Sequence, residues 1–288
     1  MSQSTLQENF EIVIEPNRGW MRIDWRALWA YRDLLLLLVR REFLSKYKQT
    51  VLGPAWFVIN PLLTTIVFTV VFGKVAHIST DGIPPVLFYL CGLLGWNYFS
   101  QVVTTGAATF QSHSALFSKV YFPRLTVPLS VAIATLCAFA LQAVTFAGFY
   151  LYYKLCTPEA AGLAPGWRIV FLPLLVLQIG ALSLGVTLWM SAATAKYRDL
   201  LQLNQFIMQL WMYATPIIYP VSKIPGKWLW LVWLNPMSTI IESFRICIFG
   251  QGTVNPMYVV GSVALTAAIF LSGIMFYQKT ERTVADIA

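Results

Sequence analysis

Six long apolar segments alternate with short polar ones along the chain, and none of the six contains Asp, Glu, Lys or Arg. Each exceeds the roughly 20 residues that an α-helix needs to cross the hydrocarbon core of a bilayer. The pattern predicts an all-α integral membrane fold with six transmembrane helices, because a helix satisfies its own backbone polar groups in lipid. The predicted spans are Val51–Gly73, Pro84–Phe110, Leu125–Tyr153, Ile169–Ala195, Leu200–Val221 and Met257–Gln278.

The residues before the first span form two segments, and residues 51–288 form the predicted six-span transmembrane domain. Residues 1–23 are polar and are expected to form a cytosolic tail. Over residues 24–50, charged side chains recur at four- and seven-residue intervals opposite Leu and Tyr, which is typical of an amphipathic helix at the membrane interface. The alternative, a seventh span beginning at Leu34–Val39, is disfavoured because charged residues follow that run at once.

The apolar stretch between the fifth and sixth spans is interrupted, and it carries the charged residues Glu242 and Arg245. A continuous span here would take both charges through lipid. Two short helices that enter and leave on the same side are favoured instead, since broken backbone at membrane depth is tolerated where protein or water lines it. We therefore predict a re-entrant helical pair over about residues 222–255, broken at Asn235-Pro236. Glu242 and Arg245 are spaced to form an i,i+3 pair.

Composition and charge agree with a membrane protein. Hydrophobic residues make up 58% of the chain and charged residues only 11%, which is outside the range of soluble globular domains. Of the 20 Lys and Arg residues, 14 lie on one side of the membrane and six on the other if the loops alternate. The positive-inside rule then predicts that both termini are cytosolic. This topology and contact with anionic lipids explain the net charge of +8, so nucleic acid is not an expected partner.

Several motifs of enzymes and ion-driven transporters are missing from the sequence. It contains no G-x-x-x-x-G-K-[ST] phosphate loop and no G-x-S-x-G or H-E-x-x-H hydrolase motif. The predicted spans also lack the carboxylates that mark proton and ion pathways. The four cysteines show no metal-ligand spacing. We therefore expect no catalytic residue, no metal and no directly bound cofactor, and the energy for any transport must come from another protein.

The polar residues inside the spans are uncharged and are accompanied by many aromatic ones. Gln202, Gln205 and Gln209 share one face of the fifth span, and Gln101 with Thr104 forms a similar row in the second. Two interpretations stay open: hydrogen bonds between helices, or a wall for a hydroxyl-rich solute. An aromatic ring can stack on the C–H face of a sugar, although core packing is the alternative for each residue. The candidates for a substrate passage are Trp56, Phe57, Gln205, Gln209, Trp211, Tyr213 and Tyr219.

The order of several short motifs resembles one family of membrane proteins. These motifs are RREFLSKYKQTVLGPAWFVINPL from the end of the amphipathic helix onward, KVYFPR before the third span, AKYRDL between the fourth and fifth spans, and NPMS at the break before the last span. Together they resemble the permease subunit of type-2 ABC exporters, in the polysaccharide branch that exports O-antigen, capsule or teichoic-acid chains. The resemblance extends from about Trp25 to the C-terminus.

This resemblance implies a homodimer in the bacterial inner membrane that binds two cytosolic ATPase subunits. The partner subunits would bind ATP and Mg²⁺, and the passage would export a lipid-linked polysaccharide, with O-antigen the first expectation. A coupling helix would occupy about residues 111–124, and Glu242 and Arg245 would belong to an outer gate. The residues expected to contact the ATPase are Phe117, Lys119, Tyr121 and Arg124, with Tyr197, Arg198 and Asp199 as a second contact.

Other functions stay open at this point. The chain could export capsular polysaccharide, teichoic acid, a drug or a lipid with the same architecture. A membrane-embedded glycan or lipid transferase is the alternative from another class, and it would need a cluster of polar catalytic residues. For Lys119 and Arg124 the simpler interpretation is topological charge, and for Arg198 and Asp199 it is a salt bridge within the loop.

Overall fold

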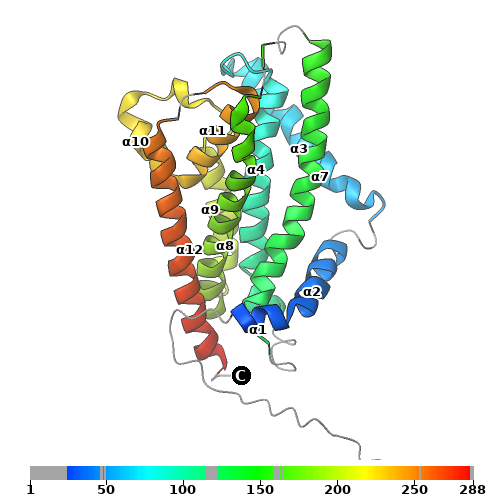
Figure 1. Ribbon diagram of the computed structural model, residues 1–288, viewed down its shortest axis with the longest axis vertical. Coiled ribbons are helices and arrows are strands. Elements are labelled where there is room, and N and C mark those ends of the chain that lie inside the picture. The colour runs from blue at the N-terminus through cyan, green and yellow to red at the C-terminus, as the bar shows by residue number, and fades with distance from the viewer. Residues whose placement is uncertain are drawn as a thin grey trace, which may run out of the picture.

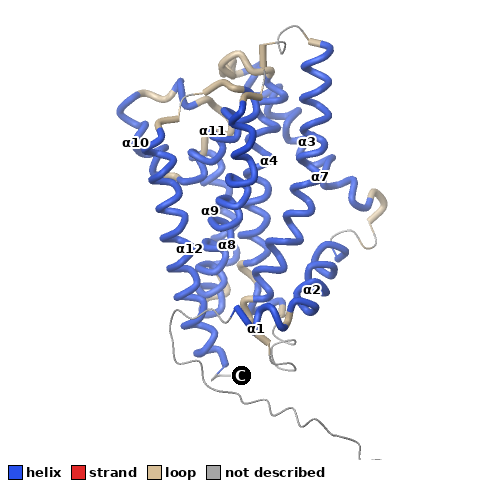
Figure 2. The backbone as a smooth tube through the Cα atoms, in the orientation of Figure 1, coloured by secondary structure: helices blue, strands red, loops and turns tan. Residues whose placement is uncertain are grey.

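In the computed structural model, helices joined by loops make up the part of the chain that is described (Figure 2). The structure describes residues 25–45, 48, 50–113, 122–157, 162–163, 165–252 and 254–285. No β-strand occurs among these residues. The prediction of an all-α fold is confirmed.

Five helical segments of the described chain are long and apolar enough to cross a membrane, and they correspond to predicted spans one to four and six. In Figure 1 the first of them lies obliquely, and those that follow it run roughly along the long axis of the molecule. The first combines a 3₁₀ turn (Gly53–Ala55), α3 (Trp56–Phe68) and a π-helical turn (Thr69–Val75). The others are α4 (Pro85–Gly106), α7 (Thr126–Cys156), α8 (Leu172–Lys196) with the preceding turn Trp167–Phe171, and α12 (Pro256–Ala285).

The prediction for the fifth span was wrong at its C-terminal boundary. α9 begins at Leu200 as expected but ends at Ala214, so it is 15 residues long. At 1.5 Å per residue it measures about 22 Å, less than the hydrocarbon core of a bilayer. Pro216 has no backbone N–H to continue the helix, and the Ile217 N–H donates to the Thr215 carbonyl in a tight turn instead. Hydropathy continues past this break, which is why the apolar pattern overestimated the helix.

The segment expected to form an amphipathic helix over residues 24–50 is divided into α1 (Trp25–Ala30) and α2 (Arg32–Ser45). α2 has 14 residues, so it is too short to be a further span. It packs against α7 through Leu38, whose side chain is 1% exposed and contacts Phe122 and Val127. Figure 1 places α1, α2 and the last turns of α12 at the same end of the bundle, which we call the terminal end.

The break predicted at Asn235-Pro236 separates α10 (Gly226–Leu234) from α11 (Pro236–Phe249). The Asn235 side chain caps α11 by accepting a hydrogen bond from the Met237 N–H at 3.1 Å. Gly250, at φ +71°, ends the helix. Both ends of this helical pair approach the loop after α3: Ser222 donates to Asp81 at 2.6 Å, and Gln251 lies beside Gly82. The pair therefore enters and leaves at one end of the bundle, opposite the terminal end, which we call the hairpin end.

α8 and α12 make the most extensive helix–helix contact in the described part of the chain. Their backbones meet at Gly185 and Gly273, where a Cβ atom on Gly273 would lie 2.5 Å from the Gly185 carbonyl oxygen. Hydrogen bonds from Trp189 to Ser272 (3.0 Å) and from Gln178 to Ser262 (2.9 Å) join the same two helices. Small residues allow this close approach, which drives helix association in lipid by van der Waals contact. α4 lies on the other side of α8 and is buried over most of its length.

Candidate functional site

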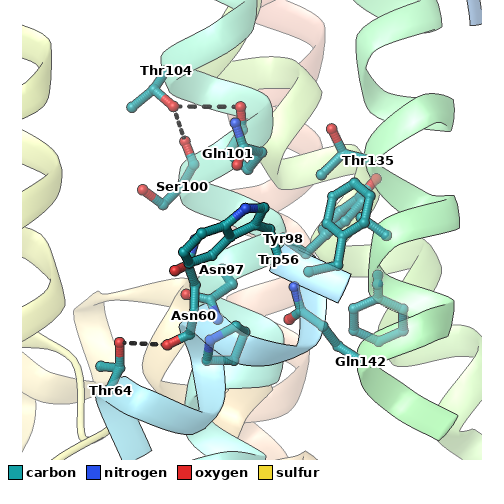
Figure 3. A pocket seen from close by; sticks show the side chains of 14 residues that line it. Trp56, Asn60, Thr64, Asn97, Tyr98, Ser100, Gln101, Thr104, Thr135 and Gln142 are labelled. Atoms are coloured by element: carbon teal, nitrogen blue, oxygen red, sulfur yellow. Dashed lines mark hydrogen bonds between the residues drawn. The ribbon is translucent and has the colours of Figure 1, made fainter. Parts of the chain in front are cut away.

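A groove of about 460 Å³ lies among α3, α4 and α7 (Figure 3). It is formed by the first turns of α3, the last turns of α4 and the middle of α7, so it lies toward the terminal end of the bundle. Its polar lining consists of carboxamides and hydroxyls, and its aromatic lining includes Trp56, Phe57, Tyr98 and Phe139. The volume is within the usual range for small-molecule sites, about 300–1,000 Å³.

The α3 wall includes a proline inside the helix, and the hydroxyls of two threonines lie nearby. Pro61 has no N–H, so the hydrogen bond it would give to the preceding turn is missing. The hydroxyl of Thr64 donates to the Asn60 carbonyl at 3.0 Å, and that of Thr65 donates to the Pro61 carbonyl at 2.8 Å. Figure 3 shows the Thr64–Asn60 bond at the edge of the groove. The carboxamide of Asn60 and the ring of Trp56 project from this first part of α3.

The α4 wall carries a row of polar side chains at helical spacing. Asn97, Gln101 and Thr104 lie four and three residues apart, so they share one face of the helix. The Thr104 hydroxyl donates to the Ser100 carbonyl at 2.7 Å, and Gln101 Nε2 donates to the Thr105 hydroxyl at 3.1 Å. These bonds hold the side chains against a well-packed helix and leave oxygen lone pairs directed outward.

The α7 wall is joined to α4 by a tyrosine. The Tyr98 hydroxyl lies 3.5 Å from the Ala132 carbonyl, and the Tyr98 ring packs edge-on against Phe139 with 5.7 Å between centroids. Gln142 and Thr135 add a carboxamide and a hydroxyl on this side. Amides and hydroxyls beside aromatic rings can bind a solute that combines hydroxyl groups with an apolar face.

The groove contains two of the predicted passage residues, Trp56 and Phe57. It also contains residues that were not selected from the sequence, among them Asn60, Asn97 and Gln142. A signal for part of this set was present, because Gln101 and Thr104 stood out as a polar row in the second span. Asn60 was hidden by its position beside the proline, and Gln142 stands alone in an apolar segment.

The other predicted passage residues lie on or after α9, outside the groove. Gln205, Gln209 and Tyr213 are exposed on one side of α9, and the Tyr219 hydroxyl donates to the Tyr213 carbonyl at 3.0 Å. Trp211 instead points to the break in the helical pair. A single protomer therefore does not bring the two predicted sets of residues together.

Trp211 belongs to a polar junction that connects α9 with the α10–α11 pair. Its indole N–H donates to Asn235 Oδ1 at 3.0 Å, and Asn235 Nδ2 donates to the Thr215 hydroxyl at 2.9 Å. The adjacent Pro236 carbonyl accepts from Ser262 of α12 at 3.1 Å. The Asn235 side chain and the Pro236 carbonyl at the break thus have partners, as broken backbone away from water requires.

The predicted i,i+3 pair of Glu242 and Arg245 is confirmed, with 3.4 Å between Arg245 Nη1 and Glu242 Oε2. Both side chains are buried, facing α4 rather than the molecular surface; Arg245 is 1% exposed. The guanidinium lies 3.7 Å from the centroid of the Phe88 ring, and Nη2 donates to the Ile217 carbonyl at 3.1 Å. The pair therefore connects α11 to α4 and to the turn that follows α9.

At the terminal end, the predicted ATPase-contact residues are partly described. Phe117, Lys119 and Tyr121 lie outside the described residues. Arg124 Nη1 donates to the Glu281 carbonyl at 3.2 Å, and the Arg124 carbonyl accepts from the Tyr277 hydroxyl at 3.0 Å, so Arg124 is tied to α12.

The other anchor of the same region is Gln111, which lies in the short helix α5 (Thr109–Ser112). Gln111 Nε2 donates to the Thr194 carbonyl of α8 at 3.1 Å. The second predicted contact, made of Tyr197, Arg198 and Asp199, is exposed in the turn between α8 and α9. Both regions lie at the terminal end of the bundle.

Comparison with known proteins places the chain among membrane transporters. Residues 33–249 match the family model described as ABC-2 type transporter. The chain is 34% identical to the O-antigen export system permease protein RfbA of Myxococcus xanthus over 223 residues, which are 76% of this chain and 82% of that protein. The protein of the same name from Klebsiella pneumoniae is 28% identical over 88% of this chain and 95% of its own length.

A more distant relative is the polysialic acid transport protein KpsM of Escherichia coli, which is 20% identical over 86% of this chain and 93% of its own length. The family match covers well over half of the chain, and the resemblance seen in the sequence motifs is confirmed. The chain belongs to the ABC-2 type transporter membrane family.

Proposed function

We propose that the protein is the transmembrane subunit of an ATP-driven exporter that moves a lipid-linked polysaccharide, an O-antigen chain, across the bacterial inner membrane. The observation that carries the proposal is the groove of amides, hydroxyls and aromatic rings, found in a chain that belongs to the ABC-2 type transporter family. Relatives named as O-antigen export permeases are 26–34% identical, against 20–21% for those named as polysialic acid transport proteins. O-antigen is therefore the favoured cargo, ahead of capsule or teichoic acid.

Two separate cytosolic ATPase subunits, which would bind ATP and Mg²⁺, are proposed to supply the energy for export. The chain lacks the glycine-rich motif that holds nucleotide phosphates in ATPases of that kind. Residues 111–124 are proposed as the main docking segment, with Phe117, Lys119 and Tyr121 in it. Its ends at Gln111 and Arg124 are hydrogen-bonded to α8 and α12. A displacement of the segment would therefore be transmitted to both helices.

The placement in the membrane follows from charge and exposure. The excess of Lys and Arg favours cytosolic termini, with the terminal end of the bundle facing the cytosol. α9 and the turns after it are proposed as the fifth of six crossings, and α10 and α11 as a re-entrant pair at the outer face. α2 is proposed to lie in the interface plane, because Leu36 and Leu37 are more than 60% exposed beside exposed arginines.

A second copy of the chain is proposed to cover α9. Gln202, Gln205 and Gln209 are all exposed on this helix. Three carboxamides facing lipid would leave their hydrogen bonds unmade, which costs free energy that a polar partner removes. A two-fold dimer would place both copies of this face together and would set the polar row of α9 along a shared passage.

The proposal is tested by reconstitution in liposomes with a lipid-linked O-antigen, with and without the ATPase. Export that requires both proteins and ATP is expected. Export by the chain alone, or ATP hydrolysis by the chain alone, would contradict the division of labour. Export of an apolar drug or a lipid in place of the glycan would favour the alternative exporter, and covalent modification of the glycan would favour a transferase.

A further inference from the structure

The groove among α3, α4 and α7 has no charged lining residue. Its 14 lining residues include no Asp, Glu, Lys, Arg or His. The polar lining is made of the carboxamides of Asn60, Asn97, Gln101 and Gln142 and of hydroxyl groups. Such groups hydrogen-bond neutral solutes well, but they supply no counter-charge for an ion.

The three threonine hydroxyls of this lining are committed as donors to their own helices. Thr64 donates to the Asn60 carbonyl, Thr104 to the Ser100 carbonyl and Thr135 to the Val131 carbonyl, at 2.7–3.0 Å. A hydroxyl has one proton and two lone pairs, so each of these side chains offers its remaining lone pairs to a ligand. The threonine part of the wall therefore accepts hydrogen bonds and does not donate them.

A polar wall without charge distinguishes between two classes of sugar. A hydroxyl group of a neutral sugar can donate to the threonine oxygens and accept from the carboxamide N–H groups. A carboxylate or phosphate can only accept hydrogen bonds, so it can bond to the carboxamide N–H groups but not to the threonine oxygens, and its charge loses hydration without a cation to replace it.

We propose that this groove selects uncharged, hydroxyl-rich glycan chains and discriminates against chains whose residues carry carboxylate or phosphate groups. The inference rests on the proposed function and narrows its substrate class. The aromatic rings of Trp56, Phe57, Tyr98 and Phe139 provide the stacking surface, and the lack of a charged lining residue provides the selection.

The test compares two hexasaccharides that differ in charge, maltohexaose and hexagalacturonate, by calorimetric titration of the purified protein in lipid nanodiscs. The wild-type protein should bind maltohexaose more tightly by about tenfold or more, since one unpaired charge in the groove outweighs the 1.4 kcal/mol that a factor of ten represents. Equal binding of the two sugars, or tighter binding of hexagalacturonate, would overturn the inference. Binding of neither sugar would also overturn it.

A charge placed in the wall gives the complementary test. Gln101→Lys supplies a cation at the groove and should raise the affinity for hexagalacturonate by about tenfold, and Gln142→Lys should do the same from the opposite wall. Gln251→Lys is the matched control, because it makes the same change on an exposed loop residue outside the groove. If both groove variants unfold at the wild-type temperature and yet leave the ratio of affinities unchanged, the selection does not lie in this groove and the inference fails.

Export assays separate this inference from the proposed function. With the ATPase present, export of a neutral O-antigen but not of an acidic one supports both. Export of both chains at equal rates overturns the selectivity and leaves the proposed function intact. Export of neither chain overturns the proposed function, while the binding data still report on the groove.

Discussion

At the scale of single residues, Arg245 shows how a charge is accommodated inside an apolar helix bundle. Its guanidinium contacts the Phe88 ring, the Ile217 carbonyl and the Glu242 carboxylate at the same time. Gly92 leaves the room for it, since a Cβ atom there would lie 3.2 Å from Arg245 Nη2. The pair with Glu242 was proposed as part of an outer gate, and these contacts describe how such a gate would be held against α4.

Replacing Arg245 by Met should lower the free energy of unfolding by about 3–5 kcal/mol, because the Glu242 carboxylate would stay buried without a partner. The double variant with Glu242→Gln should recover a large part of that loss. Thermal unfolding in detergent measures both. An unfolding temperature unchanged by Arg245→Met would contradict the role given to the pair.

Trp56 gives the second prediction at this scale. Its ring lines the groove and is 38% exposed. Trp56→Ala should lower the affinity for maltohexaose by roughly three- to tenfold, the contribution expected of one aromatic stacking contact. Trp167→Ala, which removes an exposed Trp outside the groove, is the control and should leave binding unchanged. Loss of affinity in the control alone would show that the sugar binds outside the groove.

At the scale of helices, the α8–α12 pair and the α10–α11 pair show two ways to join elements in lipid. α8 and α12 use contact between backbones at Gly185 and Gly273. α10 and α11 use hydrogen bonds at their break, including the bond from Ser262 of α12. α12 therefore connects the break at Pro236 with Arg124 at the terminal end, where Tyr277 donates to the Arg124 carbonyl.

Two glycines of α12 provide a matched test of the close contact. Gly273→Ala should destabilise the protein by about 1–3 kcal/mol, because the new Cβ would clash with the Gly185 carbonyl oxygen. Gly261→Ala adds the same methyl group where nothing lies within 4 Å, so it should be neutral or slightly stabilising. Thermal unfolding compares the two, and equal effects would count against a tight α8–α12 contact.

Arg124 provides a prediction about coupling. Arg124→Glu removes the bond to the Glu281 carbonyl and reverses a charge in the proposed docking segment. The glycan exported per ATP hydrolysed should fall by roughly fivefold or more, in the range of typical coupling energies between sites. Arg168→Glu, an exposed reversal just before α8, should leave the ratio unchanged. Paired ATPase and export assays decide; an unchanged ratio in Arg124→Glu would remove it from the coupling path.

At the scale of the whole molecule, one protomer leaves its functional surfaces incomplete. The groove lies on one side of α4, and the exposed carboxamides of α9 lie in a separate region. A second copy that covers α9 would bury the carboxamides and bring two sets of polar helix faces toward one axis. The homodimer proposed from the family resemblance is consistent with this unpaired polar surface.

Gln205→Cys tests this arrangement in a background without the four native cysteines. The two copies of Cys at this position should form a disulfide-linked dimer in the membrane under mild oxidation, because the two-fold axis would place them near each other. Val260→Cys on the exposed side of α12 is the control and should stay monomeric on a non-reducing gel. A dimer through position 260 alone would assign the interface to α12.

The sequence by itself determined the membrane class of the protein, the positions of five long helices and the break at Asn235-Pro236. These follow from local physics: a charge-free apolar run must form a helix in lipid, and an Asn-Pro pair favours the start of a new helix, with Asn as its cap and Pro at its first position. Local pattern also predicted the pairing of Glu242 with Arg245, since residues three apart share a helix face. It failed at the end of α9, where the apolar run continues beyond the helix.

Only the tertiary structure decided where those elements meet. The groove takes Asn60, Gln101 and Gln142 from three helices, and the Arg245 site joins α11 to Phe88 of α4. Helical periodicity reports which residues share a face, but it does not report which face of another helix lies opposite. That choice depends on close contacts such as Gly185 with Gly273, which form only when helices far apart in the sequence pack together.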